Sequence, residues 1–346
     1  AAGNRRILHS YDIKNAYLYA LIPEADRVFM EQPKGFSIDD ISKKCDADLL
    51  KWYVSKGLKV PTNLKPGEKL VCRIRRALYG LKSSTRLYKA EMTAWFVSQN
   101  FIPLSSDDCV FVYRDADSQI DVEAYIYVDD ILVSVANEAS AEWFKDRFYS
   151  KWKSSPGSGG LAKFLLGMDI IRCPEIDGVI LSQQGMIEEV AKKHGCTSGR
   201  TYATPMTRDF DPSYDDGIED LDTTKYHYRS IVGAILFIVT HTRADCSTAC
   251  NMLCTAMQKP QRKHWDAALR LLSYLFQTRT LGLCFTANTP KDLLNKPYAH
   301  VDASHAGEKG SRSRLGWTIT LNGATVAFSS KLISSICLSS AEAETT

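Results

Sequence analysis

Two adjacent carboxylates inside an apolar run constrain this chain more strongly than any other feature. Asp129 and Asp130 interrupt the run Ala124–Val135, whose other residues are mostly apolar or aromatic. Apolar residues on both sides predict two short strands, with the acids at or near the tip of a hairpin. Because neighbouring like charges repel, a cation would stabilise the pair, and carboxylate oxygens suit Mg²⁺. The alternative is an ordinary turn that faces water, since Asp is a common turn residue.

A third carboxylate favours the metal site. Asp12 ends a short, predicted apolar strand, and the following Ala16, Tyr17 and Leu18 suit a turn or a helix. If adjacent strands bring Asp12 to the Asp129–Asp130 pair, the acids would hold two metal ions about 3.5–4 Å apart, as in enzymes of in-line phosphoryl displacement.

Composition is ordinary. The chain has 346 residues, 45% of them hydrophobic and 24% charged, which is typical of a soluble globular protein with two or more cores. Neither a run of 18 apolar residues nor a signal-peptide pattern is present, so we expect an intracellular, cytoplasmic protein without a membrane anchor, or one inside a virus-like particle. Ten scattered cysteines predict reduced thiols. Cys246, Cys250 and Cys254 recur at a helical spacing just after His241, and we expect a buried helix face rather than a metal site.

Basic residues cluster in one segment, although the net charge is only +3. Six of them fall within 17 residues: Arg73, Arg75, Arg76, Lys82, Arg86 and Lys89. Such a cluster suits contact with the phosphates of a template or primer, and the alternative is a solvated helix face.

Turn-forming residues and apolar spacing predict the other elements. We expect a surface insertion at 37–70 and a flexible linker at 154–160. The predicted strands are 178–182, 298–302, 315–321 and 325–329, with a turn at Asn322-Gly323, and the predicted helices are 183–194, 228–256 and 262–277. In the last helix, Trp265, Leu269, Leu272 and Phe276 form the predicted apolar stripe.

Ten blocks in order along the chain resemble the reverse transcriptase and ribonuclease H region of Pol polyproteins from copia-type LTR retrotransposons. The blocks are 12–18, 28–36, 78–82, 127–130, 164–168, 203–206, 228–233, 242–245, 301–304 and 338–344. The resemblance implies a multidomain α+β fold, with a polymerase palm of antiparallel sheet and helices, a thumb, a connection segment and a truncated ribonuclease H-like α/β start. The implied domains are partial fingers and palm at 1–153, palm end and thumb at 154–222, a helical connection at 223–293, and the N-terminal part of a ribonuclease H-like domain at 294–346.

The implied activity is RNA-directed DNA polymerisation on an RNA template with a DNA primer and dNTPs. Asp12, Asp129 and Asp130 would hold two Mg²⁺ ions, with Mn²⁺ as a substitute, that activate the primer 3′-hydroxyl and neutralise the triphosphate. Tyr17 resembles a steric gate against ribonucleotides. The remaining implied contacts are Tyr127 and Val128 to the nucleotide, Arg73, Arg75, Arg76, Lys82 and Arg86 to template and primer, and Asp302 and Glu344 to the metal of an incomplete ribonuclease H site.

Departures from the family pattern keep a second hypothesis open. Ser83 and Thr85 stand where the family usually has Gln and Pro, which predicts weaker nucleotide contact. Because Asp12 lies near the first residue and the sequence stops at Thr346, we expect missing parts of the fingers and of the ribonuclease H segment, no ribonuclease H cleavage, and a protease and integrase elsewhere in a polyprotein. The alternative function is a truncated or decayed, non-catalytic relic that at most binds nucleic acid. A metal-dependent nuclease is a third hypothesis.

Overall fold

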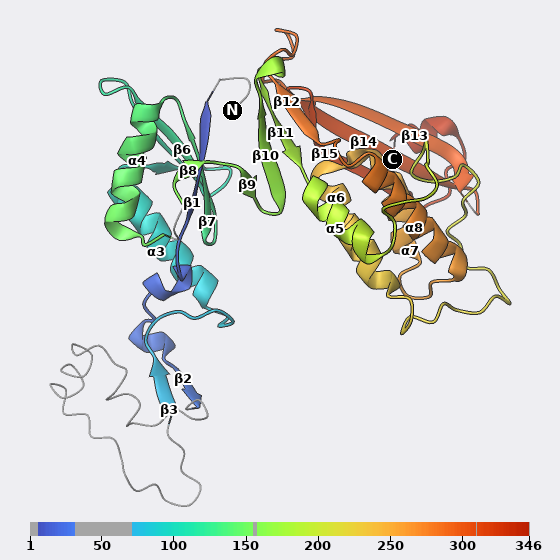
Figure 1. Cartoon of the computed structure of the whole chain (residues 1–346), viewed down its shortest axis with the longest axis horizontal. Coiled ribbons are helices and arrows are strands. Elements are labelled where there is room, and N and C mark those ends of the chain that lie inside the picture. Colours follow the sequence, from blue (N-terminus) through green and yellow to red (C-terminus); the bar gives the residue numbers. More distant parts are fainter. Residues whose placement is uncertain (1–5, 32–70, 155–157, 309, 346) are drawn as a thin grey trace, which may run out of the picture. The chain divides into compact units, whose positions relative to one another are not determined.

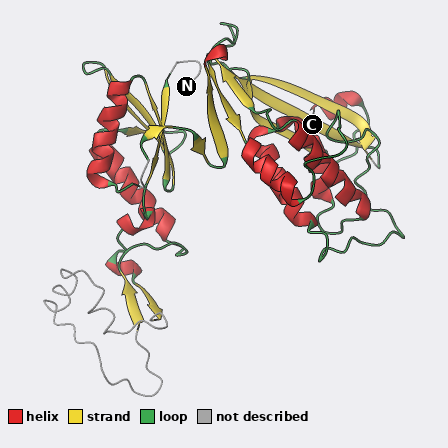
Figure 2. Cartoon of the chain, in the orientation of Figure 1, coloured by secondary structure: helices red, strands yellow, loops and turns green. Residues whose placement is uncertain are grey.

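The computed structural model describes residues 6–31, 71–154, 158–308 and 310–345 (Figure 1). The predicted insertion at 37–70 and the centre of the predicted linker lie outside these residues. Helices and antiparallel sheets both contribute to the fold, which confirms the mixed α and β class (Figure 2).

Most elements follow one another with short connections within the described ranges, but residues 194–227 form a long connection between α5 and α6. The α-helices are α3 (Ser84–Ser98), α4 (Glu138–Lys151), α5 (Gln184–Lys193), α6 (Tyr228–Thr242), α7 (Ser247–Thr255), α8 (Arg262–Gln277) and α9 (Ser340–Thr345). The 3₁₀ turns are η1 (Ala16–Tyr19), η2 (Glu24–Asp26), η3 (Pro174–Ile176) and η4 (Ala244–Cys246). The strands up to the chain centre are β1 (Ile7–Asp12), β2 (Val28–Glu31), β3 (Val71–Ile74), β4 (Ile102–Pro103), β5 (Val110–Asp115), β6 (Ile120–Tyr127), β7 (Asp130–Val135) and β8 (Gly160–Leu161). The later strands are β9 (Phe164–Leu165), β10 (Met168–Cys173), β11 (Gly178–Ser182), β12 (Leu283–Thr286), β13 (Tyr298–Glu308), β14 (Arg312–Leu321) and β15 (Ala324–Leu332).

Four sheets form within the described part of the chain. Their strand orders are β4-β5-β6-β7-β1-β8, β12-β11-β10-β9, β13-β14-β15 and β2-β3. Strands β6 and β7 are neighbours separated by two residues, so the predicted hairpin around the acidic pair is confirmed. The predicted strand that ends at Asp12 and the turn after it are also present, as β1 and η1.

The chain divides into two compact units, and the smaller contains residues 13–113 and 126–129. Its longest helix, α3, buries one face with residues three and four apart, as expected for an amphipathic helix. The buried apolar side chains of this face are Leu87, Tyr88, Met92, Trp95 and Phe96. The Phe96 ring stacks on that of Phe111 with centroids 4.5 Å apart. The α3 helix therefore has a fixed rotation in this unit.

The larger unit contains residues 1–12, 114–125 and 130–346. Here α4 packs its aromatic face on β1: the Tyr11 ring lies 5.1 Å from the rings of both Phe144 and Phe148. Arg6, directly before β1 and 9% exposed, donates to Ser134 and pairs with Asp121 at 2.9 Å. Apolar packing and a compensated charge thus hold β1 in its register with β7.

Helices α5 to α8 enclose one apolar core in the larger unit. The strand predicted at 178–182 is confirmed as β11, and the helix predicted at 183–194 is confirmed as α5, but the single helix predicted at 228–256 is wrong. The structure has α6 and α7 with a break at Arg243, whose backbone angles (φ −128°, ψ 57°) are not helical. The guanidinium of Arg243 is buried and paired with Asp245, and this pairing accompanies the change of chain direction.

Helix α8 has the predicted bounds, so that prediction is confirmed. Its buried face, however, is not the predicted apolar stripe but a neighbouring face of the helix. The fully buried residues of the helix include Ala268, Leu271, Leu272 and Leu275, whereas Trp265, Leu269 and Phe276 are only partly buried. Small Ala side chains permit close helix packing at the centre of the face, and the bulky side chains cover its margins. As predicted, Cys246 and Cys250 are buried in the same core, and Cys254 is partly buried.

The last sheet confirms the predicted strands and their turn. Asn322 (φ 50°) and Gly323 (φ 87°) join β14 to β15 in a two-residue hairpin, which requires positive φ at both positions. Helix α9 packs through Ala343 against Ala303 and Leu315 of this sheet. Helix α7 approaches the sheet through Thr248, whose hydroxyl donates to Ser330 at 3.0 Å.

Among the described helices, none combines the length and the apolarity that crossing a membrane requires.

Candidate metal centre

Asp12 and Asp130 are direct partners in the antiparallel pair of β1 and β7. The register runs from Ile7 opposite Val135 to Asp12 opposite Asp130, with no shift between. Side chains at directly opposed positions share one face of the sheet, so these two half-buried carboxylates point to the same side. Like charges at such positions destabilise a sheet unless a cation lies between them. The donor set of hard carboxylate oxygens fits Mg²⁺ or Mn²⁺.

Val128 and Asp129 form the turn between β6 and β7. Val128 has φ 57°, in the left-handed region that a β-branched side chain avoids at a cost of about 1–3 kcal/mol. Two hydrogen bonds hold the turn: the Tyr88 hydroxyl donates to the Val128 carbonyl at 2.9 Å, and the Ile13 N–H donates to the Asp129 carbonyl at 3.0 Å. The backbone that carries Asp129 is therefore strained and anchored.

The negative charge of Asp129 affects the pKa of the Tyr88 hydroxyl. Burial raises the pKa of the Tyr88 hydroxyl, and the nearby negative charge of Asp129 raises it further. The hydroxyl accordingly stays protonated, as a hydrogen-bond donor to the turn, at any physiological pH. The Tyr127 side chain just before the turn is 62% exposed.

Three other side chains in the described part of the chain lie close enough together to bind one metal ion. The ligand atoms of Asp107, Asp108 and Cys109 all lie within 4.8 Å of one another, and Asp12, Asp129 and Asp130 do not form such a group. In the first group, Lys89 pairs with Asp108, and the Cys109 N–H donates to Asp107 in a turn. A cation there would compete with Lys89, and a thiol is a poor ligand for Mg²⁺. The chemistry of the donors favours Asp12 and Asp130 for a hard cation.

Tyr17 on η1 lies in a cluster of aromatic rings with Tyr79, from the segment between β3 and α3, and Tyr88 on α3. Its ring centroid is 4.6 Å from that of Tyr79 and 5.6 Å from that of Tyr88, both in edge-on geometry. Its hydroxyl lies 3.3 Å from the Thr85 hydroxyl. One of the two residues that depart from the family pattern therefore contacts the predicted steric gate, and the other, Ser83, precedes the first turn of α3.

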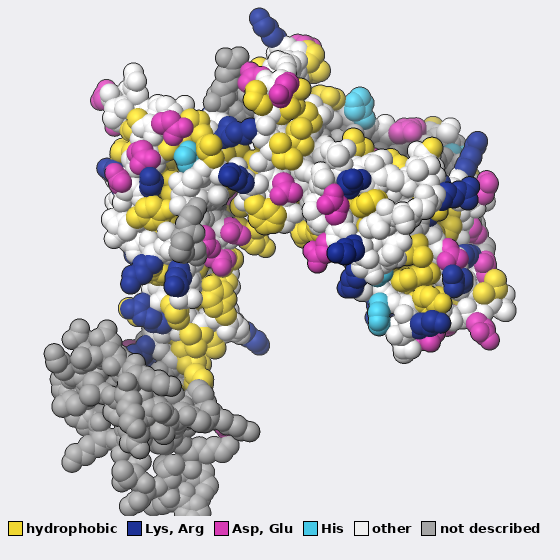
Figure 3. Space-filling view, viewed as in Figure 1, with side chains coloured by type: hydrophobic (Ala, Val, Ile, Leu, Met, Phe, Trp, Pro, Cys, Tyr) yellow, Lys and Arg dark blue, Asp and Glu magenta, His cyan; other side chains and the backbone are white. Residues whose placement is uncertain are grey.

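Several members of the basic cluster already have partners within the chain. Arg73 pairs with Glu24, Arg86 with Asp26 and Lys89 with Asp108. Arg76 donates to the Leu18 carbonyl at 2.7 Å, and Lys82 and Arg75 are exposed. Ion pairs at the surface are worth little, so a phosphate can replace the carboxylate partners at small cost. Figure 3 shows basic and acidic side chains interspersed on the face in view.

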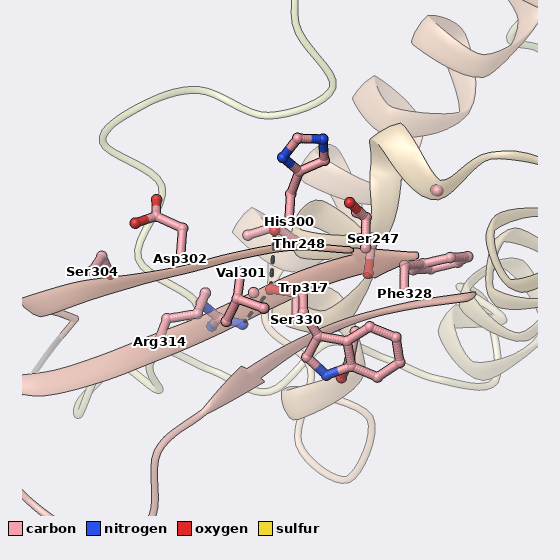
Figure 4. Close-up of a pocket in the computed structure, with 14 residues that line it drawn as sticks. Ser247, Thr248, His300, Val301, Asp302, Ser304, Arg314, Trp317, Phe328 and Ser330 are labelled. Carbon is pink, nitrogen blue, oxygen red and sulfur yellow. Dashed lines mark hydrogen bonds between the residues drawn. The ribbon is translucent and has the colours of Figure 1, made fainter. Parts of the chain in front are cut away.

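Asp302 lies on the polar face of β13, beside a hollow of about 360 Å³ (Figure 4). His300, Asp302 and Ser304 alternate with Val301 and Ala303, so they share the face that α7 approaches. Glu344 is exposed on α9, and the neighbouring Ala343 packs against Ala303, which belongs to the other face. Strand alternation therefore directs Asp302 away from the face that α9 covers.

Arg314 and Ser330 also line the hollow beside Asp302. Arg314 donates to Asn251 at 2.8 Å and lies 3.4 Å from the Ser330 hydroxyl, which links the sheet to α7. These contacts give the polar face of the sheet a structural role in attaching α7.

Tyr88 is the site residue that the sequence analysis missed. Its position on the apolar face of α3, beside Leu87 and Met92, is also that of an ordinary core residue. The contact with Val128 spans 40 residues, so no local pattern signals it.

The sequence is similar to one protein family and to several known polyproteins. A profile of the family described as reverse transcriptase (RNA-dependent DNA polymerase) matches residues 53–208. The chain is 27% identical over 341 residues, 96% of its length, to the retrovirus-related Pol polyprotein from transposon TNT 1-94 of Nicotiana tabacum, and covers 23% of that protein. It is 28% identical over 338 residues, 97% of its length, to those from transposons RE2 and RE1 of Arabidopsis thaliana, and covers 20% of each. The chain thus spans about a fifth of the length of these relatives.

Proposed function

We propose that this chain, whose residues 53–208 match the reverse transcriptase family and which is similar over most of its length to retrovirus-related Pol polyproteins of transposons, is the RNA-directed DNA polymerase part of such a polyprotein. Its substrates would be an RNA template, a DNA primer and dNTPs. The single observation that carries the proposal is the pairing of Asp12 with Asp130 on adjacent strands, beside a strained turn that presents Asp129.

The proposed roles of the residues follow from this arrangement. Asp12, Asp129 and Asp130 would hold the divalent ions, which when bound lower the pKa of the primer hydroxyl and neutralise phosphate charge. The β1–β7 pair sets the separation of the Asp12 and Asp130 carboxylates. The rings of Tyr79 and Tyr88 fix the Tyr17 ring, which would exclude a 2′-hydroxyl from the nucleotide position. Lys82 and the arginines at 73, 75, 76 and 86 would bind template and primer phosphates.

The finer domain assignment belongs to the same proposal. The six-stranded sheet with α3 and α4 would be the palm, and the helices α6 to α8 would belong to the connection segment. Three antiparallel strands followed by α9 support the start of a ribonuclease H-like domain at 294–346. Since strand alternation separates Asp302 from the α9 face, we expect no Mg²⁺-dependent cutting of an RNA–DNA hybrid by this chain.

A primer-extension assay tests the polymerase proposal. The chain is incubated with an RNA template, a labelled DNA primer, dNTPs and Mg²⁺, and is compared with Asp129→Asn. We expect extension by the parent chain and a loss of at least about 100-fold in Asp129→Asn, because several kcal/mol of charge stabilisation disappear and each 1.36 kcal/mol is a factor of ten. The matched control is Asp266→Asn, which removes an exposed carboxylate on α8 and should retain full extension.

A non-catalytic nucleic-acid-binding chain is the second candidate function. Ser83 and Thr85 favour it, because the family's usual amide at the first position is absent. Binding of a primer–template duplex with no extension by either the parent chain or Asp129→Asn would select this candidate. Extension that is unchanged in Asp129→Asn would refute the proposed metal site.

A further inference from the structure

Tyr88 connects helix α3 to the turn that carries Asp129. Its side chain is 3% exposed, and its hydroxyl donates to the Val128 carbonyl at 2.9 Å. Tyr88 also lines a hollow of about 260 Å³, together with apolar residues such as Met92 and Phe111 and polar ones such as Lys89. A buried hydroxyl loses free energy without a hydrogen-bond partner. The bond to Val128 is therefore part of the folded structure of this unit.

The backbone on both sides of Asp129 is held by hydrogen bonds. The Val128 carbonyl belongs to the peptide group before Asp129, and Tyr88 binds it. The Asp129 carbonyl belongs to the peptide group after it, and the Ile13 N–H binds it at 3.0 Å. Because the orientation of these two peptide groups sets φ and ψ of Asp129, it also sets the direction of the bond to its side chain.

The hydrogen bond from Tyr88 stabilises an unfavourable backbone conformation at Val128. Val128 has φ 57°, which a β-branched residue keeps only where surrounding contacts enforce it. Relaxation to negative φ would turn the Val128 carbonyl away from Tyr88 and rotate the peptide group that precedes Asp129.

We propose that Tyr88 is a positioning residue of the polymerase reaction, whose hydroxyl holds the strained turn and so directs the Asp129 carboxylate to its metal ion. This inference rests on the proposed function. It assigns Tyr88 a role through Asp129 and no contact with substrate. Partners that orient metal ligands typically change metal affinity about 10–100-fold when removed.

The substitution Tyr88→Phe tests the proposal, because it deletes the hydroxyl and retains the ring that packs on Tyr17. The matched control is Tyr228→Phe in α6, which also removes a buried hydroxyl that donates to a backbone carbonyl, that of Leu253 at 2.8 Å. Mn²⁺ affinity of the full chain is measured by electron paramagnetic resonance titration. The affinity that Asp129→Asn removes defines the site. Primer extension supplies kcat and the KM for dNTP.

We expect Tyr88→Phe to weaken Mn²⁺ binding at this site about 10-fold and to lower kcat with little change in the KM for dNTP, while Tyr228→Phe changes neither quantity. Equal Mn²⁺ affinities of the parent chain, Tyr88→Phe and Tyr228→Phe would overturn the proposal. If Asp129→Asn leaves Mn²⁺ affinity unchanged, the proposed metal site is wrong, and the positioning role fails with it for that separate reason.

A second variant covers the case in which Tyr88→Phe unfolds or loses affinity through general destabilisation. Glycine adopts positive φ without steric cost, so Val128→Gly should restore part of the Mn²⁺ affinity in the Tyr88→Phe background. Urea unfolding of each variant measures stability independently. If the loss of Mn²⁺ affinity matches the loss of stability in urea, and if Val128→Gly does not restore the affinity, Tyr88 has a purely structural role.

Discussion

At the scale of single residues, the Arg243–Asp245 pair shows how a buried charge shapes this chain. The guanidinium of Arg243 is 1% exposed and makes two hydrogen bonds to Asp245, at 2.9 and 2.7 Å. It also donates to the Thr278 hydroxyl and carbonyl at the end of α8. Burial of Asp245 alone would raise its pKa, but the hydrogen bonds and charge of Arg243 outweigh burial and lower the pKa. The pair therefore joins the break between α6 and α7 to α8.

Removal of the Asp245 carboxylate should lower the stability of the chain. We expect Asp245→Asn to lower the free energy of unfolding by about 1–3 kcal/mol, since it leaves Arg243 buried without its counter-charge while the partly exposed Asp245 position limits the loss. Urea denaturation measures the change. The control is Asp266→Asn in the exposed i,i+4 pair with Arg262, which should change the free energy of unfolding very little because solvent screens the pair.

The same comparison has a defined pH dependence. Because the folded pKa of Asp245 lies below its ordinary value, its contribution is present above the unfolded pKa of about 3.9 and is lost as pH falls through the lower folded pKa. The stability difference between the parent chain and Asp245→Asn should therefore be constant near neutral pH and shrink below about pH 4. A difference that persists at low pH would show that charge is not its cause.

At the scale of elements, turns and helix interiors impose opposite requirements on glycine. Gly323 lies in the turn between β14 and β15 with φ 87°, and an added Cβ would lie 3.3 Å from the Cys284 carbonyl. Gly233 lies on the exposed side of α6, where an added Cβ would meet no atom within 4 Å. One position needs the freedom of glycine, and the other does not.

Alanine should have opposite effects at these two positions. We expect Gly323→Ala to destabilise the chain by about 1 kcal/mol or more, because L-residues avoid that φ. We expect Gly233→Ala to stabilise it by about 0.5–1 kcal/mol through helix propensity. Urea or thermal unfolding of both variants gives the comparison, and a shift of the same sign at both positions would contradict this account of the turn.

At the scale of the whole molecule, two groups of carboxylates within the described residues are candidates for a divalent cation. Asp12 and Asp130 face each other across two strands, with Asp129 next in the chain, whereas Asp107, Asp108 and Cys109 form a compact exposed group. A ligand that binds only the folded chain raises its stability according to concentration and affinity. Thermal unfolding with and without metal can therefore identify the site that binds.

We expect Mg²⁺ or Mn²⁺ at about 100 times its dissociation constant to stabilise the parent chain by about 2.7 kcal/mol. The shift in unfolding temperature should be lost in Asp12→Asn and in Asp129→Asn. It should persist in the matched double variant Asp107→Asn/Asp108→Asn. Loss of the shift in the double variant alone would move the cation to the exposed group and contradict the assignment to Asp12.

Local patterns predicted much of the secondary structure, and they failed where a distant contact decides. The hairpin around Asp129, the strand before Asp12 and the Asn322-Gly323 turn depend on neighbours in the sequence, so alternation and turn residues revealed them. The break at Arg243 depends on Thr278, 35 residues away, and the buried face of α8 depends on the helices around it. The spacing of apolar residues did not contain this information.

By itself, the sequence determined which carboxylates are candidates for a metal site, their order along the chain, and which family the chain resembles, because these properties depend only on the order of residues. The tertiary structure alone decided that Asp130 is the residue opposite Asp12, that Tyr88 reaches the turn that carries Asp129, and that helix α7 approaches the face of the sheet that contains Asp302. The physical reason is register: pairing between distant strands, and the direction of each side chain from them, follow from packing of the whole core.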